Sequence, residues 1–228
     1  MNEWKTVSNS ETLIINIKRS EYFSCFSHLA GAIATLIGLA LLIAKSRGET
    51  GFLIVSLLYG LSMCSMFTFS ALYHANKHLE DATNIWRKLD HIAIFFMIAG
   101  SYSPLCYIYL SGAWHWSILV IAWSFVVAGI ILKLFFIKAP RIFSTLIYIS
   151  MGWIAIIPVK QLWQSMPHVN FFLILGGGVA YSIGALFYAI KKPNPFPKVF
   201  GFHEIFHLLI LVGALLHYVA INLSFTLS

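Results

Sequence analysis

Seven runs of about twenty apolar residues follow one another along this chain of 228 residues. An α-helix rises about 1.5 Å per residue, so each run is long enough to cross the roughly 30 Å of hydrocarbon in a bilayer. The expected spans are 23–44, 52–73, 91–110, 116–137, 142–163, 169–190 and 204–223. We therefore expect an all-α polytopic membrane protein with seven transmembrane helices.

The composition excludes several other classes of protein. Apolar residues make up 59% of the chain and charged residues only 10%, which is unlike a soluble globular domain. Open sheets are excluded within lipid, because their edges would carry unpaired backbone groups. The net charge of +7 comes without a basic stripe interleaved with exposed aromatic residues, so we expect membrane lipid rather than nucleic acid as the partner.

The basic residues predict how the chain is oriented. When the N-terminus is placed in the cytoplasm, twelve of the fifteen Lys and Arg residues fall on the cytoplasmic side, and Lys45, Arg47 and Lys160 fall outside. This bias predicts a cytoplasmic N-terminus and an external C-terminus. Lys133 and Lys160 lie within apolar runs, so we expect both to extend to the nearer membrane surface. Residues 1–22 would be a short cytosolic segment and 23–228 one transmembrane domain.

Histidines gather at one end of the expected spans. His74 closes the second span four residues after Ser70, so both side chains lie on one face of the helix. His203 and His207, also four residues apart, begin the seventh span, and Asp90 begins the third. The topology that was derived from Lys and Arg alone places these groups at a single membrane depth on the cytoplasmic side.

This set of side chains predicts a zinc site. Three neutral imidazoles with an open fourth position are typical of catalytic Zn²⁺, whereas structural sites usually include thiolates. We therefore expect a Zn²⁺ cofactor held by His74, His203 and His207. Asp90 is a candidate general base for the water that zinc would activate, and Ser70 is a candidate for orienting that water or a ligand oxygen.

Glu21 and His28 are seven residues apart at the start of the first span, hence on one face of the helix. They either orient a metal-binding imidazole or form an interfacial ion pair. His217 lies about 15 Å beyond His207 along the same helix, too far away for the same metal. We expect His217 to be a buried, hydrogen-bonded residue.

Residues 203–207 also spell His-Glu-x-x-His, the pattern of zinc proteases in which the Glu is the base. The longer protease pattern requires Gly at position 210 and His at 213, where this chain has Ile210 and Gly213. Glu204 can instead cap the helix N-terminus, where the helix dipole favours a carboxylate. The sequence leaves open whether Glu204 has a chemical role.

Together these motifs resemble the hemolysin III branch of the progestin and adipoQ receptor family. The resemblance covers nearly the whole span region and rests on the order Glu21, His28, Ser70, His74, Asp90, HEIFH at 203–207 and His217. Ser24 departs from the Asn that is common in the bacterial branch, which weakens the comparison only in the first helix. The wider superfamily includes alkaline ceramidases. The resemblance implies zinc on the three histidines, Asp90 and Ser70 near the bound water, and hydrolysis of lipid amides by some members.

The leading hypothesis is a zinc-dependent hydrolase of a lipid amide or ester, tied to membrane homeostasis in the bacterial cytoplasmic (inner) membrane. Several members of the family are instead known as receptors, so a non-catalytic regulator or receptor-like protein with a structural zinc is an alternative. A hemolysin III-type cytolysin is another, although no charge-lined amphipathic span indicates an aqueous channel. The sequence specifies neither the substrate nor the oligomeric state.

Overall fold

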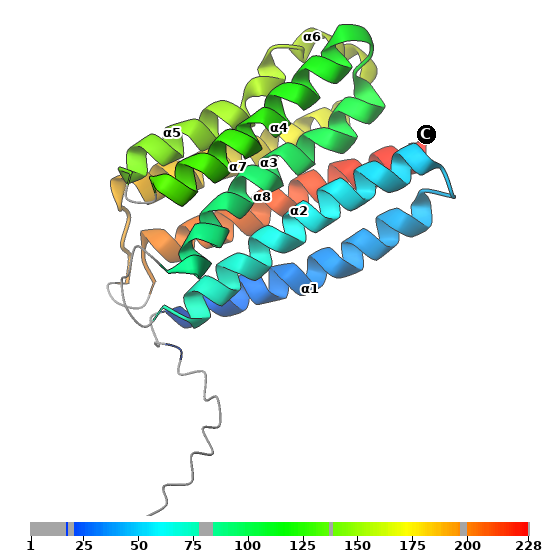
Figure 1. The fold of residues 1–228 in the computed structure, drawn as a ribbon. Coiled ribbons are helices and arrows are strands. Elements are labelled where there is room, and N and C mark those ends of the chain that lie inside the picture. The colour runs from blue at the N-terminus through cyan, green and yellow to red at the C-terminus, as the bar shows by residue number, and fades with distance from the viewer. Residues whose placement is uncertain (1–16, 18–20, 78–83, 137–138, 197–199, 228) are drawn as a thin grey trace, which may run out of the picture.

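The computed structural model describes residues 17, 21–77, 84–136, 139–196 and 200–227. Most of the expected cytosolic segment 1–22 therefore lies outside the described residues. The described residues fold into α-helices joined by short connections, with no β-strand among them (Figure 1). The elements are α1 (Tyr22–Lys45), α2 (Thr50–Ala75), α3 (Ile85–Tyr109), α4 (Gly112–Phe135), α5 (Arg141–Gly152), η2 (Ile154–Ile156), α6 (Val159–Ser165), α7 (His168–Ile190) and α8 (Phe202–Leu227).

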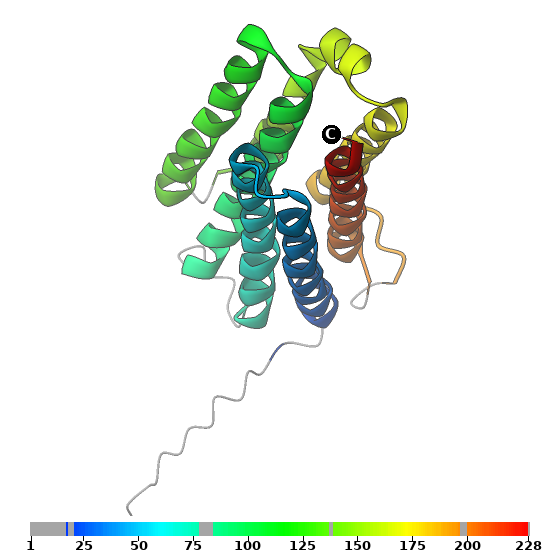
Figure 2. The same ribbon diagram turned by 90° about the vertical axis from the view of Figure 1, so that its right-hand side faces the viewer.

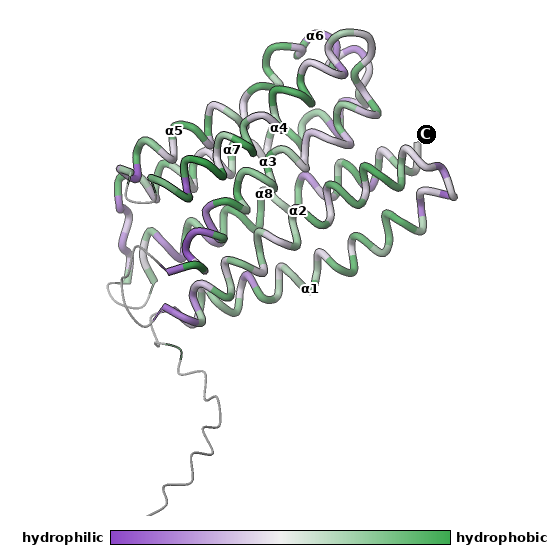
Figure 3. Tube along the Cα trace, in the orientation of Figure 1, coloured by the Kyte–Doolittle hydropathy of each residue, from purple (hydrophilic) through white to green (hydrophobic). Residues whose placement is uncertain are grey.

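The lengths and surfaces of these helices suit a bilayer. Six of them, α1 to α4, α7 and α8, are long and apolar enough to cross a membrane, and α5 with η2 and α6 is a bent seventh candidate. Large apolar side chains on their outer faces are more than half exposed, among them Ile37, Trp116, Phe135 and Leu215. Figure 3 shows apolar residues along most of each helix. The expected all-α membrane fold is confirmed.

The helices pack mainly against their neighbours in the chain, and the last helix closes the bundle. α1 packs against α2, α2 against α3, α3 against α4, and α7 against α8. α8 also lies against α1, so the first and last helices of the described part of the chain lie side by side, as Figure 2 shows. This closure brings the first turns of α8 next to the last turn of α2.

The fifth span is not the continuous helix over 142–163 that the sequence predicts. α5 ends at Gly152 and α6 begins at Val159, and the two parts are bent by 55°. Pro158, directly before α6, explains the break. Inside a continuous helix its ring would clash with the carbonyl four residues earlier, and it could not donate a backbone hydrogen bond.

Tyr102 of α3 satisfies backbone groups at this break. Its hydroxyl donates to the carbonyl oxygen of Gly152 at 2.8 Å, and the carbonyl oxygen of Met151 is a second acceptor at 3.1 Å. The hydroxyl oxygen also accepts the backbone N–H of Ala155 at 3.1 Å. Lipid cannot supply such partners, so irregular backbone within a membrane has to find them in the protein. Tyr102 thus makes the break tolerable.

Many of the polar side chains lie at one end of the bundle. The end of α2 and the starts of α1, α3, α5 and α8 lie together at the left of Figure 1, and we call this the histidine end. Lys133 points into the protein here. Its side chain is only 1% exposed and its ammonium donates to the Ser144 hydroxyl of α5 at 2.6 Å. The expectation that Lys133 extends to the membrane surface is therefore wrong, because α5 offers it a polar partner inside the bundle.

Replacing Tyr102 with Phe should lower the free energy of unfolding by about 1–3 kcal/mol, because buried backbone groups at the break would lose their partner. The thermal unfolding midpoint in detergent measures this effect. The exposed Tyr22 provides a matched control, and Tyr22→Phe should leave the midpoint nearly unchanged. Equal midpoints for the two variants would contradict the role given to Tyr102.

Candidate metal centre

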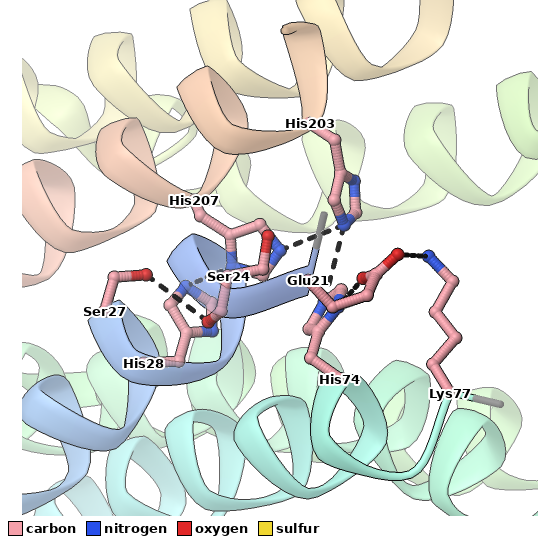
Figure 4. Close-up of polar contacts among 8 residues, drawn as sticks. All are labelled: Glu21, Ser24, Ser27, His28, His74, Lys77, His203 and His207. Carbon is pink, nitrogen blue, oxygen red and sulfur yellow. Dashed lines mark hydrogen bonds and ion pairs between the residues drawn. The ribbon is translucent and has the colours of Figure 1, made fainter. Parts of the chain in front are cut away.

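Three imidazoles converge at the histidine end. His74 comes from the last turn of α2, and His203 and His207 come from successive turns at the start of α8 (Figure 4). The Nε2 atom of His203 lies 3.4 Å from Nε2 of His74 and 3.2 Å from Nε2 of His207. His74 and His207 are each 2% exposed. Three ring nitrogens therefore face one point in a largely buried setting.

This arrangement fits a metal ion. The three ligand atoms all lie within 4.8 Å of one another. Nitrogens held about 2.0–2.1 Å from a tetrahedral Zn²⁺ are about 3.3–3.4 Å apart, close to the two Nε2 separations observed. Three nitrogens whose lone pairs point at a common centre would repel one another without a cation between them. The donor set is thus suited to a divalent ion with one position left open.

Glu21 orients His74. Its Oε2 accepts a hydrogen bond from Nδ1 of His74 at 2.6 Å, and its Oε1 accepts one from the Lys77 ammonium at 2.8 Å. Burial by itself would raise the pKa of Glu21, but the hydrogen bonds from His74 and Lys77 outweigh burial and lower the pKa to about 2. An ionised carboxylate only accepts hydrogen bonds, so the proton of His74 sits on Nδ1 and the Nε2 lone pair faces the centre.

His28 supports His207 in a similar way. Nδ1 of His207 lies 2.7 Å from Nε2 of His28, and His28 is 2% exposed. If Nδ1 of His207 donates, its Nε2 lone pair is free to face the centre, and the proton of His28 then sits on its own Nδ1. That Nδ1 and the Ser24 hydroxyl, one turn earlier, have no hydrogen-bond partner among the described residues. Helix α1 and the residue directly before it thus provide contacts to two of the three imidazoles.

A cavity of about 840 Å³ adjoins the three histidines and extends between α2, α3, α5, α7 and α8. Asp90 and the buried Ser70 both line it. Asp90 Oδ2 lies 3.5 Å from Nδ1 of His91, which donates to the carbonyl oxygen of Arg87 at 2.8 Å. The structure thus brings both predicted residues to the same cavity as the histidines.

The structure gives Glu204 a capping contact. Its Oε2 accepts the backbone N–H of Gly201, directly before α8, at 2.8 Å. This is the contact by which a glutamate in the first turn caps a helix. The sequence leaves open whether Glu204 is a catalytic base or a helix cap, and the observed contact is that of a helix cap.

His217 lies away from the centre. Its Nε2 donates to the carbonyl oxygen of Ile174 in α7 at 3.0 Å, so the expected hydrogen bond is present. Gly177 makes this approach possible, since a Cβ at that position would lie 2.2 Å from the His217 ring. The imidazole is partly rather than fully buried, because it also lines the cavity.

Sequence reasoning gave no role at the site to the cationic residues of the cavity wall, among them Lys77 and Lys133. Lys77 follows His74 by three residues, just beyond the end of α2, so its closeness to the histidine was available from the sequence. Lys133 was noticed only as a charge within an apolar run. Its direction depends on where α5 packs, and spacing along α4 does not show this.

Residues 17–218 match the model of the family described as haemolysin-III related. The chain belongs to this family. It is 36% identical to Hemolysin-3 of Bacillus cereus over 205 residues, which cover 89% of this chain and 90% of that protein. It is 34% identical to a Hemolysin-3 homolog of Bacillus subtilis (strain 168) over 198 residues, which cover 86% of this chain and 90% of that protein.

More distant relatives agree with this assignment. The chain is 27% identical to the adiponectin receptor protein of Drosophila melanogaster over 226 residues, which cover 89% of this chain and 50% of that protein. The predicted membership of the hemolysin III branch of the progestin and adipoQ receptor family is confirmed. The apolar helices and the bacterial relatives together support an integral protein of the bacterial cytoplasmic membrane.

If the three histidines hold zinc, Glu21→Gln should weaken zinc affinity about 10- to 100-fold, the usual effect of losing a group that orients a metal-binding histidine. Titration of the metal-free protein with Zn²⁺ measures the affinity. Glu49→Gln is a matched control, because Glu49 is exposed directly before α2, at the other end of that helix from His74. An unchanged affinity in Glu21→Gln would show that the carboxylate does not act on the metal.

Proposed function

We propose that the chain is a zinc-dependent membrane hydrolase that cleaves an amide or ester bond of a lipid. One observation carries this proposal. Three imidazole Nε2 atoms converge on the wall of a cavity that a carboxylate, Asp90, also lines, and His203 Nε2 lies 3.4 and 3.2 Å from the other two. A catalytic metal needs an open position beside a space for substrate, and this arrangement supplies both.

The proposed chemistry divides between the metal and the chain. Bound zinc would polarise the scissile carbonyl and make water a better nucleophile near neutral pH. Asp90 would accept the proton of that water and return it to the leaving amine or alkoxide. Ser70, four residues before His74 on the same face of α2, would hold the water or the substrate oxygen in place. Glu21 and His28 would hold the ligand rings in orientation.

The shape of the cavity supports a lipid as substrate. From the histidines it extends past apolar side chains of α3 and α7, among them Met97, Leu105 and Ile174. A hydrocarbon tail would lie against this wall while the polar bond stays near the metal. The distribution of Lys and Arg favours a cytoplasmic position for the histidine end, so we propose that substrate enters from the inner leaflet.

A structural zinc is the second candidate, and one observation favours it. The three imidazoles join α2 to α8, which lie far apart in the chain, so a metal there would cross-link the two helices. In that case the protein would act as a non-catalytic regulator or receptor-like protein. The two functions differ in whether Asp90 is needed.

The hydrolase proposal predicts that Asp90→Asn retains zinc and loses lipid turnover by at least about 100-fold, as expected on removing a general base. His207→Ala should lose both zinc and turnover. Zinc content of the purified variants and lipid profiles of the expressing strains measure the two effects.

A structural zinc predicts a different outcome. His207→Ala would then be unstable, whereas Asp90→Asn would retain full function and an unchanged lipid profile. The hydrolase would be ruled out if the wild-type protein lacked stoichiometric zinc. It would also be ruled out if neither substitution changed the lipid profile.

A further inference from the structure

Lys133 is a buried cation without a described counterion. It lies in the last turn of α4 and is 1% exposed. Among the described residues, carboxylates within ion-pair distance of a basic group are Glu21 and Asp90, and neither pairs with Lys133. An unneutralised ammonium inside a membrane protein is costly and marks a functional position by default.

The contacts of Lys133 stabilise the ammonium only in part. It donates to the Ser144 hydroxyl at 2.6 Å and lies 5.7 Å from the centre of the Tyr148 ring. A neutral hydroxyl and an aromatic face do not cancel a charge. The ammonium has three donors, of which Ser144 takes one. Lys133, Ser144 and Tyr148 all line the cavity that adjoins the histidines.

Two arginines line the same cavity. Arg87 comes from the first turn of α3, and Arg141 is the first residue of α5. Arg141 lies over the Tyr188 ring at 4.3 Å and donates to the Tyr188 carbonyl oxygen at 3.3 Å. Neither arginine pairs with a carboxylate in the part of the chain that the structure describes. We call Lys133, Arg87, Arg141 and Ser144 the basic recess.

The charge on the cavity wall is positive before any metal is added. Five cationic side chains line it against three carboxylates, an excess of two positive charges. The cations are Lys77, Arg87, Lys133, Arg141 and Lys191, and the carboxylates are Glu21, Asp90 and Glu204. Glu21 is already shared by His74 and Lys77. The start of α5 adds to the positive potential, since its first turn contains no acidic residue and its N-cap makes no side-chain hydrogen bond.

We infer that the basic recess binds a phosphate group of the molecule that occupies the cavity. This inference rests on the proposed function and specifies its substrate class as a phosphate-bearing lipid rather than a neutral one. Phosphate offers several acceptor oxygens to lysine, arginine and hydroxyl donors. The recess is built from α3, α4 and α5, whereas the metal ligands come from α2 and α8. The phosphate and the scissile bond would therefore contact different helices that line one cavity.

The test is direct binding to full-length protein carrying Asp90→Asn, which removes turnover. Dioctanoyl phosphatidic acid and dioctanoylglycerol serve as probes, since they share tails and differ in the phosphate. Phosphatidic acid should bind at least about tenfold tighter, the effect of one or more charge-assisted hydrogen bonds. Lys133→Met should abolish this preference at unchanged zinc content, and Lys133→Arg should retain it. Equal binding of the two probes, or an unchanged preference in Lys133→Met, would overturn the inference.

A purely structural role for Lys133 would give a different result. If the side chain only joins α4 to α5, Ser144→Ala and Lys133→Met should lower the unfolding midpoint together and leave probe preference intact, against the inference. The exposed Lys160 of α6 is the matched control, and Lys160→Met should change neither quantity.

Inorganic phosphate distinguishes the two sources of this group. Competition with phosphatidic acid at low millimolar concentration would support the recess as a general phosphate site that soluble phosphate can also fill. Binding of the lipid without such competition would support a lipid headgroup as the ligand. The binding result is also separable from the proposed function, because turnover of a neutral lipid together with equal binding of the two probes would retain the hydrolase and overturn the basic recess.

Discussion

Lipid offers no hydrogen bonds, and this constraint organises the whole molecule. The long helices satisfy most of their own backbone groups, and the bent fifth span relies on the Tyr102 hydroxyl. Polar side chains within the spans therefore turn inward, where protein groups can meet them. That is why Lys133 contacts Ser144 instead of lipid, and why so many charged groups share one cavity wall. The charged side chains and histidines that line the cavity gather there because lipid excludes polar groups from the outer surface.

The candidate metal centre depends on more than its three histidines. Without Glu21, the ring of His74 could place its proton on either nitrogen, and only one choice leaves Nε2 available. His28 stands in the same relation to His207. Helix α1 and its N-cap residue Glu21 thus contribute no candidate ligand, and they still contact and orient two of the three candidate ligands. The packing of α1 against both α2 and α8 makes this possible.

The sequence predicted the helical class, the approximate spans and the gathering of His74, His203 and His207, because these depend on local properties: run length, helix periodicity and the charge of connectors. It could not predict the bend of the fifth span, since tolerance of Pro158 within an apolar run depends on Tyr102 from another helix. The predicted direction of the Lys133 side chain was wrong because it depends on Ser144, which also comes from another helix. Glu204 stayed ambiguous because the protease and capping patterns use the same spacing, and only the Gly201 contact separates them.

The order of the candidate ligands along the chain affects how the protein is made. His74 and His203 are separated by 129 positions, and α8 is the last helix described. Chains are synthesised from the N-terminus, so His74 enters the membrane long before its partners exist. A metal bound by all three histidines can be captured only by a chain in which α8 has been inserted. Metal capture would then distinguish molecules that contain α8 from molecules that end before it during biogenesis.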